Sequence, residues 1–170
     1  MDAATLRARQ APLKQLYKDE PTAAMTRVGA RGAFAEPGIT STVNTWSGPV
    51  RAGLHMATGG DGSDACSGDM LLEALLACAG VTLRSIATAM KLEIRSADLR
   101  ADGFFDARGT LGVTRDVPVG CTDIKVTAEL DTDADDAKLA RLAELTERYC
   151  VVAQTLREPP KFVIKRATTS

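Results

Sequence analysis

Residues 67–83, SGDMLLEALLACAGVTL, form the stretch that decides the fold. At about 100° per residue, the charged side chains of this stretch and of the residues after it fall within one narrow sector, while leucines, methionines and other apolar residues occupy most of the remaining circumference. The charged residues are Asp69, Glu73, Arg84 and Lys91. We therefore predict a long helix, N-capped by Ser67, that lies buried at the centre of the domain.

Cys78 lies on the apolar side of this helix, on the face opposite Asp69. A second cysteine, Cys150, continues the apolar face of an amphipathic helix predicted from about Asp135. That face also carries Leu139, Leu142, Thr146 and Tyr149. Free cysteine often packs as a small hydrophobic side chain, but a thiol in a suitable site can also react. The residues alone leave both explanations open.

Strand patterns lie on both sides of the central helix. Three precede it, at residues 24–31, 38–46 and 49–57, and the short turns between them predict antiparallel hairpins. Others follow at 93–107 and 110–119, at the alternating run from Ile124 to Leu130, and at 161–167. This order predicts an α+β fold with helices packed on an antiparallel sheet. Residues 1–22 are expected to form a partly helical appendage and residues 23–170 a single domain.

Composition argues against several classes of partner. The formal net charge is -1, and the chain has only one Trp, two Tyr and four Phe, so we expect no nucleic-acid partner. The uncharged run from Ala74 to Leu83 is shorter than the roughly 20 apolar residues of a membrane span, so we expect no membrane partner. The first ten residues lack the apolar run of a secretory signal, which favours a cytoplasmic protein.

The motifs for cofactors and metals are incomplete. The loop GDGSDA, 60–65, has dinucleotide-type glycine spacing but follows a predicted hairpin rather than opening a βαβ unit. The acidic run 131–135 fails as a calcium loop at Asp136 and Leu142. Zinc is disfavoured because the chain has no CxxC pair and one histidine, His55, which we expect to be a half-buried strand residue with a structural hydrogen bond. We predict no cofactor and no metal.

The segment SGDMLLEALLACAGVTL with Cys78, followed by ERYCVVAQTL (147–156) with Cys150, resembles the OsmC/Ohr family of thiol-dependent peroxide reductases. The resemblance covers residues 24–166, and LHMATGGDG (54–62) fits the loop that enters the family's central helix. It implies an OsmC-like α+β fold and an intertwined homodimer with active sites at the subunit interface.

The resemblance also implies a chemistry. The Cys78 thiolate would attack an organic hydroperoxide and become a sulfenic acid, Cys150 would condense with it to a disulfide, and an external dithiol of the lipoyl type would reduce that disulfide. An arginine and a carboxylate would lie beside the thiol. The apolar tail of the substrate would be bound by leucines and neighbouring side chains. We expect Leu71, Leu75, Ile86 and Met90 at that pocket.

Some positions depart from the family pattern. Its usual Pro-Glu before the central helix is replaced by Ser67 and Gly68, so Asp69 is the candidate carboxylate. Arg31 is the first candidate for the arginine, ahead of Arg27 and Arg51. Other departures are Val151 in place of a proline and two cysteines without counterparts, Cys66 and Cys121.

Two functions therefore compete. The first is reduction of organic hydroperoxides, and the alternative is a non-catalytic OsmC-like protein that binds a small apolar ligand at the dimer interface or senses redox state. A thiol hydrolase or transferase is a third class, which the absence of a convincing histidine base weakens.

Overall fold

The computed structural model describes residues 1–34 and 37–156. Its helices are α1 (Ala3–Asp19), α2 (Ser67–Ala89), α3 (Ala107–Thr110), α4 (Asp136–Tyr149) and α5 (Val151–Thr155), with 3₁₀ turns η1 (Pro21–Ala24) and η2 (Met56–Thr58). Its strands are β1 (Arg31–Ala33), β2 (Ser41–Thr45), β3 (Gly48–Gly53), β4 (Ala65–Cys66), β5 (Ser96–Phe104) and β6 (Thr122–Asp131). The predicted α+β class is confirmed.

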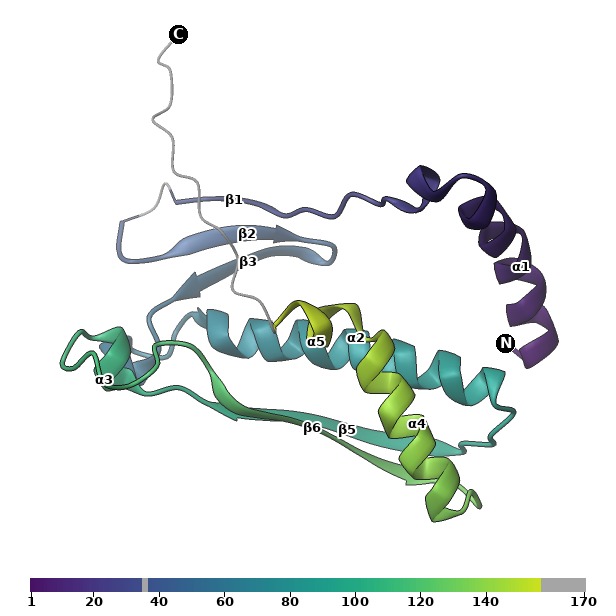
Figure 1. The fold of residues 1–170 in the computed structure, drawn as a ribbon. Coiled ribbons are helices and arrows are strands. Elements are labelled where there is room, and N and C mark those ends of the chain that lie inside the picture. The colour runs from purple at the N-terminus through teal and green to yellow at the C-terminus, as the bar shows by residue number, and fades with distance from the viewer. Residues whose placement is uncertain (35–36, 157–170) are drawn as a thin grey trace, which may run out of the picture.

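The strands form two separate sheets. In the first, β1, β2 and β3 are antiparallel neighbours, as the short turns predict, and β4 pairs with β3 in parallel. In the second, β5 and β6 form one long antiparallel pair from Ser96 opposite Asp131 to Phe104 opposite Thr122. Figure 1 shows α2 between these two sheets, with α4 crossing it.

The N-cap of the central helix α2 lies one residue earlier in the chain than predicted. Cys66, not Ser67, is the N-cap residue, with an extended backbone at φ -83° and ψ 127°. The reason is the pairing of Cys66 with Gly53, which holds Cys66 in a strand and leaves Ser67 to start the helix. Asp69 lies in the first turn, where a carboxylate favours the helix dipole, as predicted.

The hydrophobic core is built around α2, as predicted. One cluster of buried side chains contains Leu83, Ala87, Ile94 and Leu142, and the other contains Leu75, Ala79 and Cys150. The first cluster joins α2 to α4 and the second joins α2 to the start of α5, and Ile124, Ala128 and Leu130 of β6 pack against these clusters. The core therefore fixes the position of Cys150 relative to α2.

By length and composition alone, α2 would also be long enough and apolar enough to cross a membrane, with a mean hydropathy of 1.6 in its most apolar window. This is weak support for a membrane span, because the central helix of a packed domain has the same two properties. The two core clusters bury Leu75, Ala79, Leu83 and Ala87 of α2, whereas Leu71 and Val81 are exposed.

Leu142 links α4 to α2 and is 2% exposed. We expect Leu142→Ala to lower the free energy of unfolding by about 2–5 kcal/mol, since it leaves a cavity between the two helices. Urea denaturation measures this loss. The matched control is Leu111→Ala, because Leu111 is 56% exposed and its truncation should change the free energy by about 0.5 kcal/mol or less. Equal effects of the two substitutions would contradict this core.

Two strand predictions are wrong. Residues 25–30 lie outside any strand, and β1 begins only at Arg31, where it pairs with Asn44. Residues 110–119 form no strand either. The chain turns there instead: the Asp106 carboxylate accepts a bond of 2.9 Å from the Arg108 amide at the start of α3, and Gly112 adopts a φ of 69° that favours glycine. The predicted strand at 161–167 lies outside the described residues.

The second predicted helix is confirmed as α4. Asp135 is its N-cap, and its carboxylate accepts a bond of 2.9 Å from the Lys138 amide. The other acidic residues before the helix pair with Arg95, which donates to Asp131 and Asp133. The prediction that Tyr149 lies on the buried face is wrong. It is 58% exposed, with the Arg148 guanidinium 5.5 Å from its ring centre.

The N-terminal segment forms the predicted helix as α1, capped by the Asp2 carboxylate, which accepts a 2.7 Å bond from the Thr5 amide. Its first residues lie beside the C-terminal end of α2, and Figure 1 shows the rest of α1 extending away from the two sheets. None of its residues is buried. Its separation from residues 23–170 as an appendage stays a prediction.

Candidate active site

Two thiols meet between α2 and the junction of α4 with α5. Cys78 lies in the middle of α2, and Cys150 is both the C-cap of α4 and the N-cap of α5, with an extended backbone at φ -75° and ψ 107°. Cys150 is 1% exposed and belongs to the core cluster of Leu75 and Ala79. Cys78 packs against the same cluster and is half-buried. The change of direction between α4 and α5 thus brings Cys150 to Cys78.

The two thiols have unequal acidity. The pKa of Cys78 is lowered chiefly by the backbone amide of Val152, and further by the Cys150 thiol, the Val151 amide and the Thr82 hydroxyl, although burial opposes them. Burial raises the pKa of Cys150, and the neighbouring Cys78 adds to that effect. The two pKa values are therefore shifted in opposite directions, and the thiolate, which is the reactive form of cysteine, is favoured at Cys78 over Cys150.

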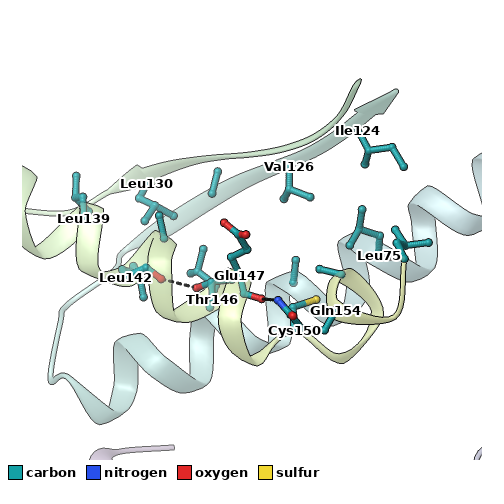
Figure 2. Close-up of a pocket in the computed structure, with 16 residues that line it drawn as sticks. Leu75, Ile124, Val126, Leu130, Leu139, Leu142, Thr146, Glu147, Cys150 and Gln154 are labelled. Carbon is teal, nitrogen blue, oxygen red and sulfur yellow. Dashed lines mark hydrogen bonds between the residues drawn. The ribbon is translucent and has the colours of Figure 1, made fainter. Parts of the chain in front are cut away.

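An apolar cavity of about 610 Å³ lies between β6 on one side and α2, α4 and α5 on the other. Figure 2 shows Leu75, Val126, Leu130 and Leu142 around it, with Cys150 at one wall. Leu75 is the one predicted pocket residue that lines this cavity. Ile86 and Met90 pack on the other core cluster instead.

The polar groups of the cavity wall come from α4 and α5. The Thr146 hydroxyl donates to the Leu142 carbonyl at 2.7 Å, and the Gln154 side-chain amide donates to the Glu147 carbonyl at 2.8 Å. Figure 2 shows the Glu147 carboxylate pointing toward β6. Sequence analysis missed this residue, although its spacing of three residues from Cys150 places it on the same side of α4.

Arg31 and Asp69 lie elsewhere in the chain. Arg31 is exposed on β1. Asp69 is exposed in the first turn of α2, about 13 Å along the helix axis from Cys78 and on the opposite face. The groups that lower the Cys78 pKa are uncharged. The described part of the chain therefore brings Cys78 and Cys150 together but not Arg31 or Asp69.

Arg51 is the candidate arginine that has a carboxylate partner in the structure. It lies on β3 and pairs with Asp64, whose side chain is 14% exposed. The parallel pairing of β3 with β4 brings this ion pair to the segment that enters α2. The sequence prediction places Arg51 behind Arg31, and no motif distinguishes the candidate arginines.

His55 has the structural role that its isolation predicts. It is half-buried, its Nδ1 accepts a bond of 3.0 Å from the Ala57 amide, and its ring packs edge-on against Phe105 at 5.3 Å. It begins the turn η2, so its predicted place in a strand is wrong. The glycines of the following loop have a steric role: a Cβ on Gly60 would lie 1.7 Å from the Leu54 carbonyl oxygen.

The fold and site define a class of α+β proteins in which a long core helix and a following pair of short helices hold two adjacent thiols. Residues 60–165 match the family model described as OsmC-like protein. The chain belongs to this OsmC-like family, as the sequence motifs predict.

Solved structures show the same fold. An OsmC-like protein from Mycoplasma pneumoniae has a TM-score of 0.64 at 14% identity, over 78% of this chain and 88% of that one. An OsmC-like protein of unknown function from Vibrio cholerae has a TM-score of 0.60 at 13% identity, over 77% and 94%. An organic hydroperoxide resistance protein from Legionella pneumophila has a TM-score of 0.56 at 14% identity, over 78% and 92%. No curated protein sequence matches the chain. At these identities the likeness concerns the fold.

Proposed function

We propose that this protein reduces organic hydroperoxides, with Cys78 as the peroxidatic nucleophile and Cys150 as the resolving thiol. The observation that carries the proposal is the contact of two unequal thiols. Cys78 is half-buried with a lowered pKa, and Cys150 is fully buried with a raised pKa. This asymmetry separates an attacking thiolate from a thiol that reacts only after the first step.

Two electrons pass from the thiols to the peroxide. The Cys78 thiolate attacks the terminal peroxide oxygen, the O–O bond breaks, and the alkoxide leaves as an alcohol after it takes up a proton. Cys78 is then a sulfenic acid. The Cys150 sulfur attacks the Cys78 sulfur, the hydroxyl group leaves as water, and a disulfide forms. A dithiol reductant of the lipoyl type then restores both thiols by exchange.

The substrate class is supported by the cavity beside Cys150, whose wall is formed mostly by leucine, isoleucine, valine and alanine side chains. Such a wall favours the apolar tail of an organic hydroperoxide over hydrogen peroxide. The Legionella protein of the same fold is named for resistance to organic hydroperoxides. We place the reaction in the cytoplasm, where dithiol reductants keep thiols reduced.

We further propose that the protein works as an intertwined homodimer. Phe34, Ile39 and Trp46 of the first sheet region and Val81 of α2 are between 73% and 102% exposed in the single protomer, and exposed apolar groups of this kind mark interaction surfaces. In the dimer, Arg31 and Asp69 from a second copy would complete the site. The arginine would orient and polarise the peroxide.

The test compares cumene hydroperoxide with hydrogen peroxide as substrates, with dihydrolipoamide as reductant. We expect kcat/KM for cumene hydroperoxide to be at least about tenfold higher, because burial of its ring in an apolar pocket contributes more than 1.4 kcal/mol. Equal rates, or no turnover of either peroxide, would contradict the proposal.

A ligand-binding role is the second candidate. The observation that favours it is that Cys150 lines the cavity, whereas the groups closest to the Cys78 thiol are uncharged. Such a protein would show saturable binding of the apolar dye 1-anilinonaphthalene-8-sulfonate while its thiols stay unchanged in stoichiometric cumene hydroperoxide. Rapid loss of two thiols per chain would contradict it.

A further inference from the structure

Gln154 places a polar side chain on the cavity wall next to Cys150. Its backbone amide donates to the Cys150 carbonyl at 3.0 Å, so the two residues lie one helical turn apart. Both line the apolar cavity, and Figure 2 shows the half-buried Gln154 side chain beside Cys150 on the wall opposite β6. A ligand in the cavity therefore meets this side-chain amide close to the thiol pair.

The side-chain amide of Gln154 is held by its nitrogen. This nitrogen donates to the Glu147 carbonyl at 2.8 Å, in the last turn of α4, where a helix leaves backbone carbonyls without an intrahelical partner. The nitrogen and the oxygen of an amide are bonded to the same carbon, so the bond to Glu147 also fixes the direction of the oxygen. Within the described chain, the side-chain oxygen of Gln154 accepts no hydrogen bond. It is thus an oriented acceptor that a ligand can use.

The other polar side chains of the cavity wall are placed differently. The Thr146 hydroxyl donates its proton to the Leu142 carbonyl at 2.7 Å. The Glu147 side chain is exposed, and Figure 2 shows it pointing toward β6 rather than toward Cys150. The remaining lining side chains are mostly apolar. The side-chain acceptor beside Cys150 is therefore the oxygen of Gln154.

We propose that the side-chain oxygen of Gln154 accepts a hydrogen bond from the terminal O–H of a neutral ligand whose apolar tail fills the cavity. The inference rests on the proposed function and makes Gln154 a residue that selects its substrate, because the bond holds the O–O–H group beside the thiols. An ether or an ionised carboxylate has no proton to donate to this oxygen. The preferred ligands are therefore neutral hydroperoxides and the alcohols formed from them.

The first test compares the binding of two probes to the reduced full chain. The alcohol 2-phenyl-2-propanol carries an O–H group, whereas its methyl ether keeps the oxygen but has no proton to donate. A purely apolar cavity would favour the ether, because an alcohol buried without a hydrogen-bond partner loses its bonds to water. We expect the alcohol to bind more tightly, with both dissociation constants measured by NMR titration. Equal affinities, or tighter binding of the ether, would overturn the inference.

Gln154→Met is the test variant, because methionine is similar in length and its sulfur is only a weak acceptor. We expect its affinity for the alcohol to fall about five- to tenfold through loss of the hydrogen bond, while its affinity for the ether changes little. KM for cumene hydroperoxide should rise with little change in kcat, since the bond forms when the substrate binds. If this variant does not fold, the order of the two probes in wild type still decides the question.

Two other variants of the cavity wall are the matched controls. Thr146→Val removes a hydroxyl that bonds to the Leu142 carbonyl. Glu147→Gln removes a charge but keeps the backbone carbonyl to which Gln154 donates. Both should keep the preference for the alcohol. Loss of the preference in either control, together with its survival in Gln154→Met, would place the acceptor elsewhere and overturn the inference.

The outcomes separate the inference from the proposed function. If wild type consumes cumene hydroperoxide but binds the ether as tightly as the alcohol, the inference is overturned and the proposed function stands. If wild type prefers the alcohol and Gln154→Met loses that preference, the role of Gln154 is supported. That result would hold even if wild type consumed no peroxide, which would contradict the proposed function alone.

Discussion

Cys78→Ser is expected to abolish hydroperoxide reduction, with kcat/KM for cumene hydroperoxide at least about a thousandfold below wild type, as for the loss of other covalent nucleophiles. A serine hydroxyl stays protonated at neutral pH. It has no sulfur atom that could take up the peroxide oxygen and become a sulfenic acid. The measurement is peroxide consumption with dihydrolipoamide as reductant. Because Cys78 is half-buried and serine is slightly smaller, the variant should fold.

The matched control is Cys121→Ser. Cys121 is also a half-buried free thiol, but it precedes β6 and lies outside the cluster that holds Cys78 and Cys150. It should keep the wild-type rate. Peroxide consumption that persists in Cys78→Ser and disappears in Cys121→Ser would mean that Cys121, rather than Cys78, is the nucleophile.

The lowered pKa of Cys78 also sets the pH dependence of the first step. The reactive form is the thiolate, so the rate of thiol oxidation should rise with pH and level off above the pKa of Cys78. Because the amides and hydroxyl around Cys78 lower that pKa, the half-maximal rate should occur at a lower pH than for an ordinary cysteine. A rapid-mixing experiment with one equivalent of cumene hydroperoxide measures this profile. A midpoint above that of free cysteine would contradict the assignment.

The parts of the fold that follow from local periodicity could be predicted from the sequence. The apolar circumference of α2 and the alternation of β6 both depend on residues close in the chain. Residues 24–31 and 110–119 could not be assigned in this way. A strand needs a neighbour that local sequence does not supply, and capping by Asp106 with the turn at Gly112 decides the second segment.

The same distinction, between what local sequence predicts and what depends on distant parts of the chain, applies to the candidate site. Both cysteines were found from motifs, but the contact between them depends on the backbone of Cys150, which turns the chain from α4 into α5 and onto α2. The pairing of Arg51 with Asp64 depends on the parallel register of β3 and β4.

Cys150→Ala is expected to limit the protein to one turnover of hydroperoxide per chain before it slows. Cys78 should still attack the peroxide, although loss of the Cys150 hydrogen bond should make its thiolate somewhat harder to form. The sulfenic acid then has no neighbouring thiol and should persist. The measurement is a burst of one equivalent of peroxide, followed by labelling of Cys78 with dimedone and detection by mass spectrometry.

Alanine is the better substitution because Cys150 is 1% exposed in an apolar cluster. Serine would bury a hydroxyl there and cost about 1–3 kcal/mol of unfolding free energy, so its loss of activity would be harder to interpret. Cys66→Ala is the matched control, since Cys66 is half-buried at the start of α2 and its side chain makes no cap hydrogen bond in the described chain. It should turn over at the wild-type rate without dimedone labelling. Continuous turnover by Cys150→Ala at that same rate would mean that the dithiol reduces the sulfenic acid directly, and Cys150 would then be a packing residue of the core rather than the resolving thiol.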